Sequence, residues 1–126
     1  MKDEYIYVAA PYTSGDTARE STVDRRYFEV TAMAAHLSKI GHVVFSPITL
    51  GHAMTSVGLK KPHSWWMDWC LTFLHDAAAL YVLEADGWQT SKGVRQEIDV
   101  AKVRNIPIVY VKPDANVIKR AVEAFD

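Results

Sequence analysis

The sequence contains a single cysteine, no long apolar run and no excess of charge of one sign. Cys70 cannot form an internal disulfide, and without Cys or His partners at ligand spacing it does not form a zinc site. No apolar stretch approaches the roughly 18 residues of a membrane span. Residues 1–5 also lack a basic segment leading into an apolar run. We therefore expect a cytoplasmic protein without a membrane partner.

The charge balance argues against a nucleic-acid polymer as partner. Fourteen Lys and Arg residues face 15 Asp and Glu residues, for a net charge of -1. Binding along DNA or RNA neutralises many phosphates and needs a basic surface. A single nucleotide needs only one or two local donors, so it remains a candidate ligand. The length of 126 residues predicts one domain, residues 1–126.

Short apolar, β-rich runs alternate with segments of helical period. The runs predict four strands, at residues 5–10, 42–46, 77–83 and 107–111. Because parallel strands need helical crossovers, the alternation predicts an α/β fold. We expect a flavodoxin-like, doubly wound parallel sheet of four to five strands with helices on both faces.

Four helices are predicted between and after these strands. The first carries apolar residues from Val23 to Leu37, with Thr17 and Glu20 as a capping box. The second begins at Ser64 and the third spans about Ser91 to Asn105. The last turns four side chains inward: Val117, Ile118, Ala121 and Val122. Residues 47–63 have no clear period and predict a long loop.

In the second of these helices Trp66, Trp69, Cys70 and Phe73 share one face, a stripe more typical of core packing than of a ligand site. None of the five histidines has a ligand-spaced partner, so we expect ordinary solvated or core histidines. No metal or organic cofactor is expected.

The functional crevice of such a sheet lies at the carboxyl ends of its strands. This places residues 11–16 and 84–93, including Asp86, at the expected site. Ser91 and Gly93 open a helix there, and a helix start binds anions through free amides, although Ser91 could simply cap the helix. Glu97 follows in the second turn, and its side chain leans back toward the crevice. Asp68 lies one turn into its own helix, where the bare pattern indicates solvent.

The run Ser91-Lys92-Gly93-Val94-Arg95-Gln96-Glu97-Ile98 resembles the nucleophile motif of nucleoside 2-deoxyribosyltransferases and the related 2′-deoxynucleoside 5′-phosphate N-hydrolases. The strand Ile6-Tyr7-Val8-Ala9-Ala10-Pro11 is similar to the first strand of that family. The resemblance spans nearly the whole chain, although only the segment around Glu97 is reasonably specific. It implies Glu97 as nucleophile, Tyr7 as the residue that holds it, and Asp68 as the aspartate that contacts sugar and base. A closer likeness is to a bacterial and phage branch without a settled activity, which shares the run Gly41 to Pro47 and Asp86-Gly87-Trp88.

Ser91 indicates which branch of the family the chain resembles. The hydrolases carry serine there and bind a 5′-phosphate, whereas the transferases carry a carboxylate that accepts from a free 5′-hydroxyl. The sequence departs from the family pattern at two positions near Glu97. Arg95 stands where the family usually has a small residue, and Asp99 stands where it has glycine. Arg95 either binds phosphate or pairs with Asp99. In addition, residues 11–16 replace the Gly- and Arg-containing first loop of the hydrolases.

These observations favour an enzyme that cleaves or transfers the N-glycosidic bond of a deoxynucleoside or its 5′-monophosphate. Tyr12, Trp88 and His52 are candidates for stacking on the base or closing the site. The alternative is a nucleotide-binding or regulatory module with the same fold and no turnover. Family members commonly pair, and the tryptophan-rich helix predicts an exposed surface for that contact. We therefore expect a homo-oligomer.

Overall fold

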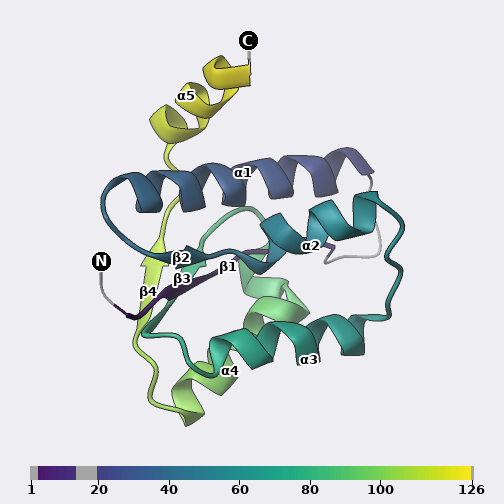
Figure 1. Ribbon diagram of the computed structural model, residues 1–126, viewed down its shortest axis with the longest axis vertical. Coiled ribbons are helices and arrows are strands. Elements are labelled where there is room, and N and C mark those ends of the chain that lie inside the picture. The colour runs from purple at the N-terminus through teal and green to yellow at the C-terminus, as the bar shows by residue number, and fades with distance from the viewer. Residues whose placement is uncertain (1–2, 14–19, 126) are drawn as a thin grey trace.

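The computed structural model describes residues 3–13 and 20–125, in which strands and helices alternate along the chain (Figure 1). The strands are β1 (Ile6–Ala9), β2 (Val44–Phe45), β3 (Ala79–Leu83) and β4 (Ile108–Val111). The α-helices are α1 (Glu20–Lys39), α2 (Pro47–Ser56), α3 (His63–Leu74), α4 (Lys92–Val103) and α5 (Ala115–Phe125). A short 3-10 helix, η1 (Trp88–Thr90), precedes α4.

The four strands of the described residues form one parallel sheet in the order β2-β1-β3-β4. Ile6 pairs with Val44 on one side and with Ala79 on the other, and Leu80 pairs with Ile108. This order matches the first four strands of a flavodoxin-like sheet, whose switch point lies between β1 and β3. The predicted fold class is therefore confirmed, with four strands.

Alternation along β1 divides the core into two layers. Ile6 and Val8 pack with Val30 and Leu37 of α1 on one face of the sheet. Tyr7 and Ala9 point to the other face and pack with buried residues of α3 and α4. Figure 1 shows α1 and α2 on one side of the strands and α3 and α4 on the other. The alternation thus turns the Tyr7 side chain toward α4.

The predicted loop at residues 47–63 is wrong over most of its length, because α2 occupies Pro47–Ser56. Proline is well tolerated in the first turn of a helix, where its missing N–H has no partner to lose. Gly51, which weakens a helix by propensity, is buried here beside Trp66: an added Cβ would lie 3.1 Å from that ring. Tertiary packing on α1 and α3 therefore outweighs the local breaker signals.

Smaller predictions also need correction. Pro62, not Ser64, is the N-cap of α3, and Ser64 lies exposed inside the helix. Val117 of α5 is buried as expected, but Val122 is 47% exposed. The Thr17 member of the predicted capping box lies outside the described residues, so that prediction stays untested.

The tryptophans of α3 are half-buried rather than exposed. Phe73 stacks on Phe45 with ring centroids 4.3 Å apart, and Trp69 and Trp66 continue the row edge to face. Cys70 and Phe73 pack against the core, as the stripe predicted. Among the described residues, no helix combines the length and apolar character that a bilayer crossing requires.

Candidate functional site

A cavity of about 610 Å³ opens beyond the carboxyl end of β1. Ala9 and Ala10 form its floor, and side chains of α2, α3 and the start of α4 form its walls. Of the residues named individually as site candidates, five line it: Tyr12, His52, Ser91, Gly93 and Glu97. It therefore lies at the switch point between β1 and β3, where the fold class places ligands.

Glu97 reaches this cavity from α4 although it is 6% exposed. The hydroxyl of Tyr7, on β1, donates a short hydrogen bond to Glu97 Oε2. Tyr7 is fully buried, so its ring cannot turn away without repacking the core on that face. The structure thus brings together the two residues that the resemblance paired, and one carboxylate oxygen is held in place.

Burial controls the protonation of this pair. It raises the pKa of the Glu97 carboxyl to about 7, and the Tyr7 hydrogen bond, which lowers it, only partly offsets the effect. The pKa of Tyr7 is raised well above its usual value, first by burial and then by the neighbouring Glu97 charge. Burial and Glu97 likewise raise the pKa of Cys70 to about 12. At neutral pH Glu97 is therefore the group of this cluster that exchanges a proton.

The start of α4 forms a second part of the cavity wall. Ser91 is its N-cap, and the Ser91 hydroxyl accepts a hydrogen bond of 3.3 Å from the Val94 amide. The predicted capping role is therefore present. A hydroxyl that accepts still has its own proton to donate, and the amides of a first helical turn have no intrahelical acceptor. Ser91, Lys92 and Gly93 together present donors to the cavity.

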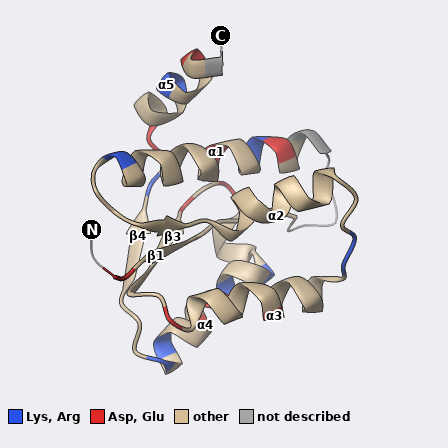
Figure 2. Ribbon diagram, viewed as in Figure 1, with Lys and Arg blue, Asp and Glu red and all other residues tan. Residues whose placement is uncertain are grey.

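Two lysines and one carboxylate make up the charged lining among the described residues, in addition to the histidines. Lys61 and His63, which flank the start of α3, line the cavity together with Lys92 of α4. The connection from α2 to α3 includes a blue stretch in Figure 2, since it carries Lys60 and Lys61. Among the described residues that line the cavity, Glu97 supplies the sole carboxylate. An anionic ligand would meet donors and cations near the helix start.

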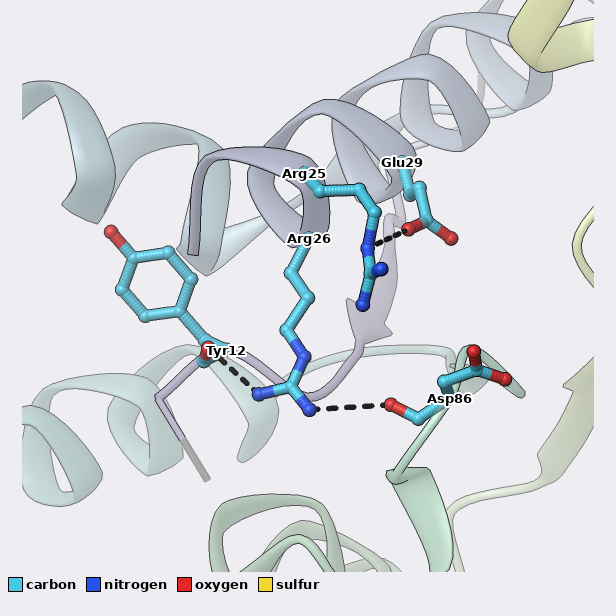
Figure 3. Close-up of polar contacts among 5 residues, drawn as sticks. All are labelled: Tyr12, Arg25, Arg26, Glu29 and Asp86. Atoms are coloured by element: carbon cyan, nitrogen blue, oxygen red, sulfur yellow. Dashed lines mark hydrogen bonds and ion pairs between the residues drawn. The ribbon is translucent and has the colours of Figure 1, made fainter. Parts of the chain in front are cut away.

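Arg26 connects the two loops that border the site (Figure 3). Its guanidinium donates to the Tyr12 carbonyl oxygen at 3.0 Å and to the Asp86 carbonyl oxygen at 3.3 Å. These loops follow β1 and β3, so one α1 side chain ties together both strand ends. The neighbouring ion pair of Arg25 with Glu29, at 3.3 Å, joins residues of one helix and contributes little to stability.

A polar cluster occupies the wall formed by α1 and α2. Tyr12 Oη lies 2.6 Å from His52 Nδ1, and His52 Nε2 lies 3.7 Å from Asp24 Oδ1. The His52 ring stacks on Tyr27 with centroids 4.0 Å apart. Burial raises the pKa of Tyr12, and the nearby charge of Asp24 adds to this. Tyr12 and His52 line the cavity, but the Tyr27 ring already covers one face of the imidazole.

Five predicted site residues do not line this cavity: Tyr7, which bonds Glu97 from β1, and Asp68, Arg95, Trp88 and Asp86. Asp68 is exposed on α3, as its bare pattern indicated, and Arg95 is exposed on α4. The Trp88 ring packs against the core and lies 5.6 Å from the Tyr110 ring. Asp86 offers its carbonyl to Arg26, and its side chain is exposed. Trp88 and Asp86 instead line a smaller hollow of about 280 Å³ formed by residues 84–90.

Sequence reasoning also missed residues that the structure brings to the cavity, among them Gly51, Lys61, His63, Trp66 and Met67. Gly51 lies on α2, Lys61 follows it, and the other three lie on α3. The mistaken loop at 47–63 removed the α2 wall from the prediction. A proline at the first position of a helix was the available signal. Among the described residues, no group of three or more His, Cys, Asp or Glu side chains is arranged to hold a metal ion.

Comparison with curated proteins finds no match to the chain, so no characterised relative connects it to the deoxyribosyltransferases. A family model described as a domain of unknown function, DUF1937, matches residues 4–112. That range includes all four strands, helices α1 to α4 and every residue named above as lining the cavity. The chain belongs to the DUF1937 family.

Proposed function

We propose that this protein is an N-glycosidase or 2-deoxyribosyltransferase that acts on a deoxynucleoside or its 5′-monophosphate, with Glu97 as the nucleophile. The observation that carries the proposal is a buried carboxylate, held by Tyr7, that lines a cavity at the switch point of the sheet. It is joined by the resemblance of the segment from Ser91 to Ile98 to the nucleophile motif of that family.

The environment of Glu97 suits attack on an anomeric carbon. With a pKa of about 7, a substantial fraction of Glu97 is ionised at neutral pH. The charged form is poorly solvated, which favours its reaction with the electron-poor C1′ of an oxocarbenium-like transition state. Tyr7 keeps one carboxylate oxygen hydrogen-bonded while the other is available to the sugar. Water or a second base then resolves the covalent intermediate.

The charge of the cavity supports a 5′-monophosphate as substrate. Ser91 and the first-turn amides of α4 offer hydrogen bonds, and Lys92 and Lys61 offer positive charge. A phosphate at this helix start would be stabilised by the dipole and by charge-assisted hydrogen bonds. Glu97 lies one to two turns further along the same helix, so a bound 5′ end and the nucleophile share one rigid element.

The departures at positions 95 and 99 do not alter the lining of the cavity. Arg95 and Asp99 are both exposed on α4, and neither contributes to the wall. We therefore do not assign Arg95 to phosphate binding. Asp68, which the resemblance proposed for proton transfer, is exposed outside the cavity, so another group has to assist departure of the base in this chain.

The test is incubation with each of the four deoxynucleoside 5′-monophosphates and the matching nucleosides, followed by chromatography for free or exchanged base. Glu97→Gln should abolish the reaction, since an amide does not attack C1′. Asp99→Asn, an exposed acidic residue two positions further along α4, should retain it. Activity that survives in Glu97→Gln would refute the proposed nucleophile.

A nucleotide-binding module without turnover is the competing function, because the cavity would bind an anion whether or not Glu97 reacts. Tight binding of a nucleotide with no released base and no exchanged base would establish that reading. Calorimetry with the same nucleotides provides this measurement beside the turnover assay.

We also propose that the protein acts in the cytoplasm as a homo-oligomer. Apolar side chains remain exposed at the β4 edge and on α5, with Val109 39%, Tyr110 47% and Val122 47% exposed. Sedimentation at working concentration should give a dimer or larger species, and a monomer would contradict this proposal.

A further inference from the structure

Tyr12, His52 and Asp24 form a connected polar chain that the proposed nucleophile does not use. The chain runs from the cavity through the Tyr12 hydroxyl to His52 Nδ1, 2.6 Å away, and from His52 Nε2 to Asp24 at 3.7 Å. Asp24 is 62% exposed, so its end of the chain meets solvent. The inner end, at Tyr12 and His52, lines the cavity.

This chain approaches the cavity from the layer opposite to Glu97. Asp24 and His52 belong to α1 and α2, which cover one face of the sheet, whereas Glu97 belongs to α4 on the other face. Tyr12 follows β1 at the strand end between the two layers. A sugar held between the layers could face Glu97 with C1′ and direct its base toward the α1 and α2 wall.

We infer that Tyr12, backed by His52 and Asp24, is the proton donor to the departing base. The inference rests on the proposed function, since it assigns the second half of the same reaction. The reaction needs a proton donor to the base, and the cavity otherwise lacks a carboxyl group for this role. Asp68 does not line the cavity, and Glu97 is the sole carboxylate among the described residues that do.

The step balances with the groups named. Glu97 carboxylate forms a bond to C1′ as the C1′–N bond breaks, and the electron pair of that bond stays on the base nitrogen. The Tyr12 hydroxyl gives its proton to the base, while protonated His52 passes its Nδ1 proton to the phenol oxygen. His52 ends neutral and the glycosyl ester is neutral. In hydrolysis the same chain takes a proton from the attacking water.

The surroundings fit a relay rather than a permanent phenolate. Burial and the charge of Asp24 raise the pKa of Tyr12, so a free phenolate is disfavoured. Tyr12 can therefore give up its proton only if it receives another one at the same time. Asp24 and Tyr27 of α1 face His52, and Arg26 bonds the Tyr12 carbonyl oxygen. Lys61 and His63 line the cavity with them. Asp24 is a positioning residue, since its carboxylate lies 3.7 Å from His52 Nε2 and does not line the cavity.

The experiment compares two leaving groups. One substrate is a deoxynucleoside 5′-monophosphate that wild type hydrolyses, and the other is 4-nitrophenyl 2-deoxyribofuranoside 5-phosphate, whose nitrophenolate departs without protonation. Tyr12→Phe and His52→Gln should lose about 100-fold or more on the nucleotide, as expected for a lost general acid. On the nitrophenyl substrate both variants should stay within about fivefold of wild type. This margin covers indirect effects of the substitutions and is much smaller than the rate loss expected when a general acid is removed.

Matched variants separate chemistry from packing. Tyr110→Phe, which removes a hydroxyl outside the cavity, should behave as wild type on both substrates. Asp24→Asn should reduce only the nucleotide reaction. Activity on the nitrophenyl substrate also shows that each variant is folded.

The outcomes distinguish the two proposals. Equal losses of Tyr12→Phe on both substrates, or no loss on either, would overturn the relay while leaving Glu97 as nucleophile. If wild type releases neither base nor nitrophenolate, the proposed function itself fails and the relay falls with it.

Discussion

The hydroxyl of Tyr7 donates to Glu97 across 90 positions of sequence, and both side chains are buried where β1 meets α4. A carboxylate in such a position is accessible only through the cavity that it lines. The pair therefore combines two properties that surface glutamates lack, a shifted protonation equilibrium and a constrained orientation.

Removal of the Tyr7 hydroxyl should shift the pH dependence of the reaction. The Tyr7 hydrogen bond lowers the pKa of Glu97, so Tyr7→Phe raises it further above about 7. A hydrogen bond to a charged group is worth roughly 1.5–3 kcal/mol, or about one to two pH units. The ascending limb of the pH–rate profile should move up by about one unit.

Tyr5→Phe is the matched control for that variant, because Tyr5 donates to the Phe73 carbonyl oxygen, away from Glu97. Its profile should keep the wild-type limb. An unchanged limb in Tyr7→Phe would show that the hydrogen bond does not govern the ionisation of Glu97.

Burial of Glu97 should make the protein less stable as the pH rises. The folded-state pKa of about 7 exceeds the ordinary 4.5, so the folded chain binds the proton more tightly than the unfolded chain. Stability from this group is complete below about pH 4.5 and is lost as the pH rises toward 7. The total loss is about 3 kcal/mol.

Glu97→Gln removes this titration. Relative to wild type, its free energy of unfolding should increase by about 3 kcal/mol between pH 4.5 and pH 8. Urea denaturation at both pH values measures the difference. A constant difference between the two proteins would mean that Glu97 has the same pKa folded and unfolded.

A negative charge at position 91 should weaken binding of a substrate that carries a 5′-phosphate. Asp and Asn both cap helices well and have nearly the same shape, so Ser91→Asp and Ser91→Asn differ mainly in charge. With a 5′-monophosphate substrate, the KM of Ser91→Asp should exceed that of Ser91→Asn by about tenfold, equivalent to ~1.4 kcal/mol of repulsion. With the unphosphorylated nucleoside the two should agree. Equal KM values for the monophosphate would place its phosphate elsewhere.

Gly87 should resist substitution more than Gly41. Both have a positive φ, +89° and +110°, that strains an L residue by about 1–2 kcal/mol. A Cβ at Gly87 would also lie 3.0 Å from Arg26 Nη2, whereas one at Gly41 would meet nothing within 4 Å. Thermal denaturation should therefore show a larger loss for Gly87→Ala. Equal losses would mean that Arg26 moves freely and does not hold the two loops together.

Much of the fold could be predicted from the sequence, because the spacing of apolar residues indicates which side chains are buried. The apolar runs of β1 and β3 and the switch to helical spacing after each one predict a parallel sheet. Four of the predicted site residues, Glu97, Ser91, Gly93 and Tyr12, line the cavity, since the start of a helix after a parallel strand lies at the carboxyl edge of the sheet. Ser91 as the cap of α4 followed from local chemistry alone.

The sequence could not predict what depends on packing between distant elements. Pro47 and Gly51 resemble loop signals, yet α2 forms because α1 and the Trp66 ring cover it. For the same reason His52 could not be connected to Tyr12 and Asp24, which lie 40 and 28 positions earlier in the chain.

The sequence by itself determined the alternation of the four strands with α1, α3, α4 and α5, the start of α4 and the position of Glu97 in that helix, because each follows from local spacing. Only the tertiary structure decided that Glu97 is buried against Tyr7, that Asp68 lies outside the cavity, and that Tyr12 meets His52. The burial of a side chain and its distance from residues far away in sequence depend on how the helices pack on the two faces of the sheet. No local sequence pattern encodes that packing.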